Sequence, residues 1–577
     1  MEPASGVSPP RDVEAASPPA TPSHAQPPSA RDTPRAHHHE RTYRENELSN
    51  TAVVWDDELR EWRSQDEAQE RDSDADATTV GGTPSGRVSD KRVSIEGDAE
   101  KGIAALPDGE IVWVEWDGDD DPANPFNWSN RKKWQTALIC CVFTFLVAFA
   151  GTAFGEGSES MMRELHCSRE LATLGLSIFP LGFGLGPLFT APLSEAYGRY
   201  PLYFVSCLVY LIFFIPTAYG QNIQTVIIAR FLAGIAASTG STLVGGTVSD
   251  LFLSHNRGLP MAIFSVAAFV GTGLGPAVSG YIELKKGWRW IQWVQMMFAG
   301  ALAVAIIFFT RETRGSVILS KRAKKLRKET GDDKYQCRSD AERASLAVLL
   351  KVSMTRPLYL LATESIVFFF SLWAGVAWGS LYLLLKAVPL IFGDVYGFNV
   401  GQTGLTFYSA VVATFFGFLT TYYLQDRLYK KNVAKRGPEA RLYASLIGGL
   451  VFPAGAFILA FSQGRGHWMG PVVGMALIFY GVYTIYLAVF SYLADCYTIY
   501  ASSALSGQSL CRNLAGFSFP LFTTQMYEGM GYQWASFLAG MIALVLAATP
   551  WVLFLYGPRI RANSKFAKEL ARMRGEA

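Results

Sequence analysis

Residues 264–282 read FSVAAFVGTGLGPAVSGYI, and this stretch decides the fold. It is apolar over nearly the length of a membrane-spanning helix, which needs about 20 mostly apolar residues. It also contains the poorest helix formers of soluble proteins, namely Gly271, Gly273, Gly275, Pro276 and Gly280. Membrane helices tolerate such residues because neighbouring helices support the chain and small residues let backbones approach closely. The stretch therefore predicts a transmembrane helix that is bent at its proline and closely packed.

The composition of the whole chain agrees with a membrane protein. Of its 577 residues, 50% are hydrophobic and only 17% are charged, whereas about 25% charged residues is usual in soluble domains. The net charge of +2 gives no indication of a nucleic-acid partner. The seven cysteines lack metal-ligand spacing, so we expect neither a disulfide framework nor a metal site. Because the N-terminus has no cleavable signal pattern, the first transmembrane helix would direct insertion.

The first 130 residues are rich in proline, serine and charged residues and show no sustained apolar period. Such segments cannot bury enough apolar surface to fold, so residues 1–130 are predicted to be a disordered tail. Ser94 follows Lys91 and Arg92 in a pattern that suits a basophilic kinase, although short patterns of this kind arise often by chance. We interpret the three histidines at positions 37–39 as incidental.

Twelve apolar runs follow, six on each side of a long polar loop. They lie near Trp134–Phe154, Leu171–Leu193, Leu202–Tyr219, Thr225–Thr247, Leu259–Ile282, Trp290–Thr310, Leu358–Phe392, Gly401–Gln425, Leu442–Phe461, Met469–Leu493, Ala504–Met526 and Tyr532–Tyr556. The seventh run is overlong and is therefore expected to be tilted or broken. The predicted organisation is a six-helix bundle over 131–312, a basic central loop over 313–355, a second six-helix bundle over 356–558 and a basic tail over 559–577.

The distribution of lysine and arginine predicts the orientation in the membrane. Basic residues gather in 321–328, in 427–436 and in the tail from 559, which all fall on one side of a twelve-span map. Both termini are therefore expected in the cytoplasm. The outer loop that contains Lys285, Lys286 and Arg289 argues against this orientation. The sequon at Asn127 would lie on the cytoplasmic side and stay unmodified.

An internal repeat supports the division into two bundles. In each half, a glycine on the second helix is followed nine positions later by an acidic residue, at Gly186 and Glu195 and at Gly417 and Asp426. The fourth and tenth spans also end alike, in VSDLF over 248–252 and LADCY over 493–497. Parallel repeats of six helices are typical of one large transporter architecture.

The motifs along the chain resemble those of the major facilitator superfamily, and in particular its fungal twelve-span drug:proton antiporters. The similarity covers Asp121 to about Gly557 and includes six segments: NPFNW over 124–128, GPL over 186–188 through Gly198 and Arg199, RFLAG over 230–234, the glycine-proline run over 271–280, PEARL over 438–442 and GFSFPLF over 516–522. The resemblance implies an all-α membrane protein of twelve transmembrane helices in two six-helix bundles.

Three positions depart from the family pattern. Tyr200 stands where a basic residue is common, and Glu195 stands where the loop usually has aspartate. The segment ETRG at 312–315 is similar to a Pro-Glu-Thr signature of sugar carriers, but Arg311 replaces the proline. We interpret this last similarity as incidental.

The resemblance also implies roles for individual residues. The predicted cytoplasmic gate comprises Gly186, Glu195, Gly198, Arg199, Asp426 and Arg427. The alternative is an ordinary surface loop, where an ion pair contributes only about 0–1 kcal/mol. The antiporter helix, with Gly271, Gly275, Pro276 and Gly280, would seal the centre of the protein against proton leak; its alternative is simple helix packing.

Two charged residues within the spans are candidates for proton coupling or for lining a cavity. Arg230 lies inside the fourth span, and a charge at such depth usually faces a cavity or a partner. Glu364 lies in the inner part of the seventh span, where burial would favour protonation. Snorkelling to the membrane surface is the alternative for Glu364, and it stays open; Lys386 is equally ambiguous. No single aromatic residue of the spans is singled out as a cargo contact.

The predicted function is proton-coupled export of amphipathic small molecules such as drugs, polyamines or secreted metabolites, including glycolipids and organic acids. The expected partners are the cargo, protons and the lipid bilayer, with no nucleic acid, no cofactor besides the proton gradient, and a monomeric state. The expected location is the plasma membrane, with the vacuolar membrane as alternative. A nutrient importer and a sensor that signals through the N-terminal tail are the competing functions. No enzymatic motif is present.

Overall fold

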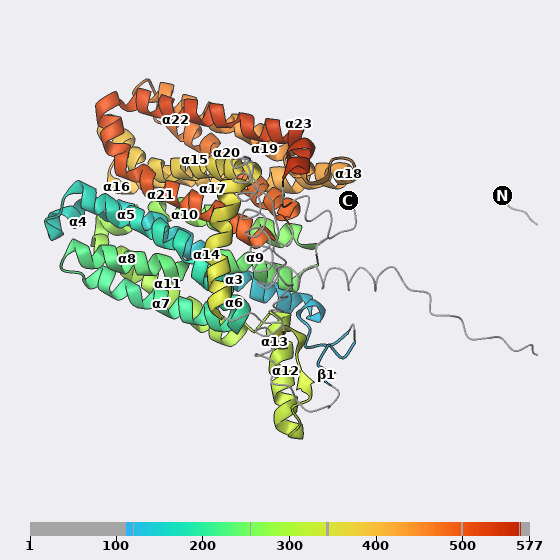
Figure 1. The fold of residues 1–577 in the computed structure, drawn as a ribbon. Coiled ribbons are helices and arrows are strands. Elements are labelled where there is room, and N and C mark those ends of the chain that lie inside the picture. The colour runs from blue at the N-terminus through green and yellow to red at the C-terminus, as the bar shows by residue number, and fades with distance from the viewer. Residues whose placement is uncertain are drawn as a thin grey trace, which may run out of the picture. The chain divides into compact units, whose positions relative to one another are not determined.

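The computed structural model describes residues 111–118, 120–253, 256–341, 346–497, 500–564 and 566. The described part of the chain is almost entirely helical, and its two halves form two neighbouring groups of helices (Figure 1). The possible kinase site at Ser94 and the histidines at 37–39 lie outside the described residues, as does most of the predicted tail.

The first half begins with a short turn, η2 (Pro125–Asn127). It continues with α3 (Asn130–Ala153), η3 (Phe154–Gly157), α4 (Ser158–Leu165), α5 (Arg169–Leu185), α6 (Pro187–Tyr197), α7 (Arg199–Tyr219), α8 (Ile223–Ala237), α9 (Thr239–Leu251), α10 (Gly258–Lys286) and α11 (Trp288–Phe309). Polar side chains cap two of these helices. Ser168 accepts a hydrogen bond from the amide of Leu171 at the start of α5, and Asn222 accepts one from Thr225 at the start of α8.

The segment between the halves is also structured. It contains α12 (Gly315–Thr330), β2 (Tyr335–Gln336), α13 (Arg338–Ala341) and α14 (Leu346–Thr363). The second half comprises α15 (Ser365–Pro389), η5 (Leu390–Val395), α16 (Val400–Thr406), α17 (Tyr408–Leu419), η6 (Thr420–Gln425), α18 (Asp426–Arg436), η7 (Gly437–Arg441), α19 (Tyr443–Ser462), α20 (Met469–Tyr497), α21 (Ala501–Met530), α22 (Tyr532–Leu546) and α23 (Ala548–Asn563).

Nine helices among the described residues are long and apolar enough to cross a membrane, or ten if the bent pair α5–α6 counts as one span. The stretch Val400–Ser462 is one of the nine, and it contains two of the predicted spans, α16–α17 and α19. The remaining predicted span is α21, which is 30 residues long but carries Gln508, Arg512 and Asn513. All twelve predicted spans therefore correspond to helices of the structure.

The helix breaks lie at two places. A bend of 41° separates α5 from α6 at Gly186, because Pro187 lacks the amide that would continue the hydrogen-bond ladder. The overlong seventh span was predicted to be tilted or broken, and it is broken. The break lies at Glu364, whose extended backbone (φ −98°, ψ 108°) separates α14 from α15. By contrast, α10 runs as one helix from Gly258 through Pro276 to Lys286.

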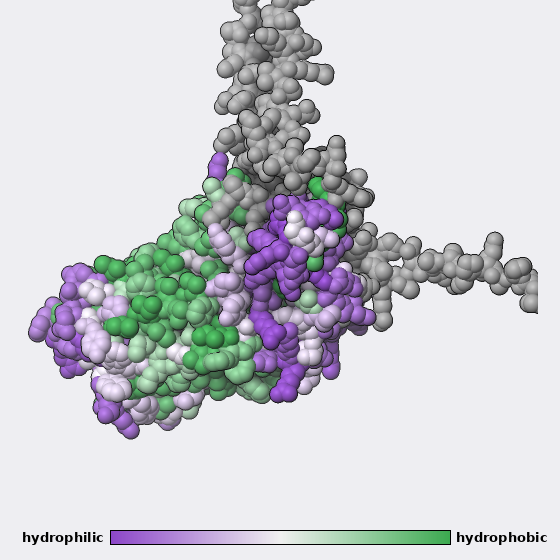
Figure 2. Space-filling view, turned by 90° about the horizontal axis from the view of Figure 1, so that it is seen from below, coloured by the Kyte–Doolittle hydropathy of each residue, from purple (hydrophilic) through white to green (hydrophobic). Residues whose placement is uncertain are grey.

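The surface and the core divide as expected in a membrane protein. On the face shown in Figure 2, hydrophobic side chains cover the middle of the helical body and hydrophilic ones cover its two ends. Exposed large hydrophobic residues are frequent on α11, α17, α22 and α23; Phe308, Val545 and Leu555 are 74%, 70% and 64% exposed. Such a surface suits lipid rather than water. Inside, the larger apolar core contains residues of both halves, such as Phe269 and Trp373.

Residues 111–128 are ordered, so the boundary of the predicted tail at residue 130 is too late. The strand β1 (Val112–Trp113) pairs in parallel with β2, and the amides of Val112 and Val114 donate to the carbonyls of Lys334 and Gln336. Beneath this pair lies a small apolar cluster formed by Val114, Leu319, Ala323 and Cys337. We call β1, β2 and α12 together the clasp.

Charge pairing fastens the clasp to the helical body. Arg322 on α12 binds Asp121 at 2.8 Å and also contacts Asp117. The side chain of Asp121 is only 4% exposed and also accepts hydrogen bonds from the amides of Asp117 and Ala123. Charge-assisted bonds of this kind are the stronger ones in proteins. The central loop is therefore held to the segment that leads into α3.

The clasp is expected to loosen in acid. The pKa of Asp121 lies below its usual value because the amide of Asp117 donates to the carboxylate, with help from Ala123 and Arg322. A carboxyl with a lowered folded-state pKa stabilises above its unfolded pKa of about 3.9, and this contribution is lost as pH falls through the lower folded value. Hydrogen-exchange protection of the Val112 and Val114 amides should therefore fall below about pH 4.

The variant Asp121→Asn should lose this protection already at pH 7, by about tenfold, since a hydrogen bond to a charged group contributes about 1.5–3 kcal/mol. A matched control is Glu329→Gln, which removes an exposed ion pair with Lys325 on α12, the helix that also carries Arg322. Equal protection factors in Asp121→Asn and the unmodified protein would contradict the role of Asp121.

Candidate functional site

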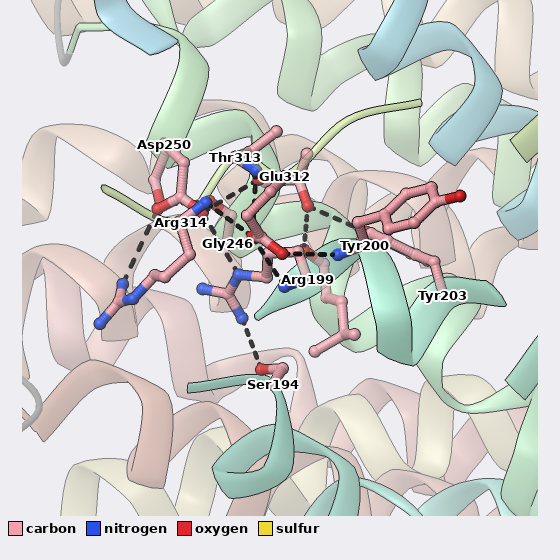
Figure 3. Close-up of polar contacts among 12 residues, drawn as sticks. Ser194, Arg199, Tyr200, Tyr203, Gly246, Asp250, Glu312, Thr313 and Arg314 are labelled. Atoms are coloured by element: carbon pink, nitrogen blue, oxygen red, sulfur yellow. Dashed lines mark hydrogen bonds and ion pairs between the residues drawn. The ribbon is translucent and has the colours of Figure 1, made fainter. Parts of the chain in front are cut away.

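The first charged cluster lies where α6 meets α7, on the predicted cytoplasmic side, and Figure 3 shows it. Arg199 begins α7 and is buried; its Nε lies 3.2 Å from Asp250 Oδ2, and its Nη1 donates to Ser194 Oγ at 2.8 Å. Asp250 lies near the end of α9 and also faces Arg314 at 3.8 Å. The cluster thus connects the ends of α6, α7 and α9 by charge.

Glu312, which follows α11, completes this cluster. Its carboxylate accepts hydrogen bonds from the amides of Arg199 (2.9 Å), Tyr200 (3.2 Å), Thr313 (3.0 Å) and Arg314 (2.9 Å). An acidic group at a helix N-terminus satisfies free amides and complements the helix dipole. Glu312 therefore ties the end of the sixth span to the start of the third.

Three of the predicted gate residues of the first half lie at this cluster, namely Glu195, Gly198 and Arg199, whereas Gly186 lies apart from it. Glu195 is half-buried on α6 and interacts electrostatically with Arg199 and Arg314, while Asp250 forms an ion pair with Arg199 that was not predicted. Gly198 has a φ of +103°, and a Cβ there would collide with the Glu312 carboxylate. Gly186 lies at the α5–α6 bend, where a Cβ would be 2.8 Å from the carbonyl oxygen of Ile235.

The second half contains a similar cluster, but not at the predicted residues. Arg441 lies 2.7 Å from Asp495, near the end of α20, and its guanidinium stacks 3.6 Å from the Tyr429 ring. Asp495 corresponds to Asp250 in the repeat that ends the fourth and tenth spans. Asp426 and Arg427 lie outside this cluster: Asp426 forms an exposed pair with Lys430, and Arg427 lies over Tyr423, so their role in a gate stays a prediction.

The two halves differ in helix geometry at this point of the repeat. Between Gly417 and Asp426 the chain passes through the π-helical segment η6, whereas between Gly186 and Glu195 it passes the bend into α6. An altered turn rotates every following side chain about the helix axis. Equal spacing in sequence therefore does not give equal positions in the two halves.

Among the described acidic residues of the second half, Glu439 is the most deeply buried, with 1% of its side chain exposed. Its two carboxylate oxygens accept from Arg561 Nε at 3.0 Å and Nη2 at 2.9 Å, and Tyr492 lies 3.3 Å away. This bidentate pair connects η7 to the end of α23. It was not predicted, although Glu439 belongs to the PEARL segment that the sequence analysis had noted.

The antiporter helix α10 lies between the two halves. Gly271 and Gly275 face α3: a Cβ at Gly271 would be 3.0 Å from Ala148 Cβ, and one at Gly275 would be 2.7 Å from the carbonyl oxygen of Phe149. On the other side, a Cβ at Gly273 would be 3.0 Å from the carbonyl oxygen of Phe407. A Cβ at Gly280 would likewise be 2.7 Å from the carbonyl oxygen of Val400. The glycines thus allow α10 to contact both α3 and α16–α17.

The two predicted proton-coupling residues lie in different surroundings. Arg230 is only 2% exposed, and its Nε donates to the carbonyl oxygen of Gly175 at 2.8 Å. Its guanidinium lies 4.1 Å from the Phe154 ring centre, so it does not snorkel. Glu364 is 5% exposed at the α14–α15 break and accepts a hydrogen bond from Tyr497 at 3.0 Å. Burial likewise argues against snorkelling there, and both roles stay predictions.

Two further charged residues, Glu156 and Arg512, are buried within the helical body. Glu156 in η3 is 7% exposed and interacts electrostatically with Lys386 of α15. Arg512 in α21 is 5% exposed, and the sequence analysis did not single it out. A lone arginine within an apolar span is a signal that would have identified it.

The sequence and the fold of this chain are both similar to those of known membrane transporters. A family model described as Major Facilitator Superfamily matches residues 138–517. The efflux pump radE of Floropilus chiversii is 34% identical over 464 residues, which cover 79% of this chain and 86% of that protein. The multidrug transporter mdrA of Aspergillus fumigatus is 37% identical over 466 residues, covering 79% and 76%. The solved proton:xylose symporter XylE has a similar fold, with a TM-score of 0.54 and 16% identity over 74% of this chain and 96% of XylE.

Proposed function

This chain belongs to the major facilitator superfamily, and we propose that it exports amphipathic small molecules in exchange for protons. In this superfamily, two bundles rock about a central site and expose it to either side of the membrane in turn. The chain is a membrane transporter of the efflux-pump group, since its relatives include radE and mdrA. Export, proton exchange and an amphipathic cargo are the proposal.

The observation that carries this proposal is the position of α10. Its glycines bring it into backbone contact with α3 on one side and with α16–α17 on the other. Such a seam leaves little room for water between the halves, which an exchanger needs if protons are to move only with cargo. The seam also permits sliding, because small residues present few interlocking side chains.

The charged clusters support the same proposal. Arg199 with Asp250 and Arg441 with Asp495 lie at corresponding ends of the two bundles. Each pair joins helix ends within one bundle, so it helps that bundle to rock as a unit against the other. We further propose that Arg230 and Glu364 take part in proton coupling, that the proton gradient is the energy source without a bound cofactor, and that a single chain in the plasma membrane suffices.

The test is flux in sealed vesicles that contain the purified protein. A pH gradient is imposed, a panel of amphipathic compounds is added, and the pH of the lumen is followed. The proposal predicts cargo-dependent proton movement opposite to the cargo, and none in vesicles without protein. Cargo movement without protons would indicate a facilitator. Unchanged flux after deletion of residues 1–110 would exclude the sensor alternative, and membrane fractionation would separate plasma from vacuolar location.

A further inference from the structure

Arg512 is a buried cation that the charged clusters do not use. It lies in the middle of α21 and is 5% exposed. Its guanidinium lies 4.6 Å from the Trp378 ring centre on α15 and 5.1 Å from that of Tyr486 on α20. Its one side-chain hydrogen bond in the described part of the chain is a long one to Ser509, at 3.4 Å, and its Nε has no partner there.

Arg230 occupies a similar environment in the other half. Its guanidinium lies 4.1 Å from the Phe154 ring and 4.9 Å from the Phe179 ring, and its Nη2 has no hydrogen-bond partner among the described residues. One tyrosine lies between the surroundings of the two arginines. The Tyr382 ring centre is 6.4 Å from that of Trp378, over which Arg512 lies, and the Tyr382 hydroxyl meets Gly151 beside the Phe179 ring, over which Arg230 lies. Tyr382 packs against Gly151 of α3 and Gly516 of α21. The two guanidiniums therefore approach one tyrosine from opposite bundles.

Neither arginine faces a carboxylate among the described residues. Other buried arginines do: Arg199 faces Asp250, and the half-buried Arg561 faces Glu439. A desolvated cation without a counter-charge is costly, and aromatic faces compensate only part of that cost. Such residues inside a membrane mark a site for an ion or substrate. The missing partner of this pair is an anion.

We propose that Arg230 and Arg512 together bind the carboxylate of an amphipathic aromatic or apolar cargo. The free N–H groups of the two guanidiniums would hold the carboxylate beside Tyr382. The rings of Trp378 and Tyr486, with Phe269 of α10 packed edge-on against both at 5.7 and 5.8 Å, would contact the apolar body. Because the arginines come from different bundles, an anion between them also lowers their repulsion as the bundles close. This inference rests on the proposed export function and narrows its cargo to organic acids.

The test is binding of matched ligands to the purified protein by titration calorimetry, without any pH gradient. The probes are 2-naphthoate, 1-naphthylacetate and 4-phenylbenzoate, each paired with its neutral amide. The unmodified protein is expected to prefer each acid to its amide at least tenfold. Arg512→Gln and Arg230→Gln should each weaken acid binding at least tenfold and leave amide binding unchanged. Arg512→Lys should restore part of the acid preference, because it restores the charge but not the bidentate geometry.

The control is Arg169→Gln. The Arg169 side chain is 55% exposed and pairs with Glu528, so this variant should change neither the affinity for acids nor the affinity for amides. Thermal unfolding of each variant checks that it is folded. Equal affinity for acids and amides, unchanged acid binding in both glutamine variants, or no binding of any acid would overturn the inference. Acid-selective binding without proton-coupled flux would instead refute the proposed function, and flux of neutral or cationic cargo without acid binding would refute only the inference.

Discussion

Replacing Gly275 with leucine is expected to abolish proton-coupled transport. A side chain at this position has no room, because the first added carbon would collide with the Thr152 hydroxyl and lie 2.7 Å from the carbonyl oxygen of Phe149 and 3.2 Å from the amide of Ala153. Backbone atoms of a packed helix cannot move aside as a flexible side chain would. The substitution must therefore push α10 away from α3 within the first bundle, which also shifts the opposite face of α10 that contacts α16–α17 at the seam between the bundles.

The expected result is either loss of cargo movement, if the displaced helix blocks rocking, or proton leak without cargo, if it opens the seam. Both appear as loss of cargo-dependent proton flux in vesicles. The matched control is Gly258→Leu on the same helix, since a Cβ at Gly258 has no neighbour within 4 Å. Wild-type coupled flux from a correctly inserted Gly275→Leu protein would contradict the role given to this contact.

Replacing Glu439 with glutamine is expected to cause the largest loss of stability among the charged clusters. The substitution leaves Arg561 without its bidentate carboxylate and removes the charge from a site that is 1% exposed. Breaking a buried pair by changing one partner costs about 3–5 kcal/mol. Arg561 is 28% exposed and partly solvated, so we expect a loss of about 2–3 kcal/mol. Thermal unfolding of the purified protein in detergent measures this loss of stability.

The comparison variant is Asp426→Asn, which removes the exposed pair with Lys430 on α18. Surface pairs four residues apart on a helix contribute about 0.3–0.5 kcal/mol, so this variant should unfold like the unmodified protein. The two variants together distinguish the cluster observed in the structure from the one predicted by sequence spacing. A larger loss in Asp426→Asn than in Glu439→Gln would contradict the importance given to the buried pair of Glu439 and Arg561.

The number and order of the transmembrane helices could be predicted from the amino-acid sequence alone. Each span can be recognised from a local property, the length of its apolar run. The helices of the structure follow the predicted runs closely. The glycine-proline run of α10 was likewise predictable as a close-packed helix, because glycine at Gly271 and Gly275 has few other uses within a membrane span. The repeat that pairs Asp250 with Asp495 also held in the structure.

The pairing of charged residues, by contrast, became clear from the folded arrangement of the helices. Asp426 was expected beside a gate and lies instead on an exposed helix, because the π-helical turns of η6 change the direction of every later side chain. Arg512 and Arg230 are far apart in sequence, yet each lies over an aromatic ring in the neighbourhood of Tyr382. The ordered clasp depends in the same way on β1 meeting β2 across more than two hundred residues. Apolar length is a property of each segment alone, whereas contacts between segments depend on how each helix bends and rotates, which local sequence patterns do not specify.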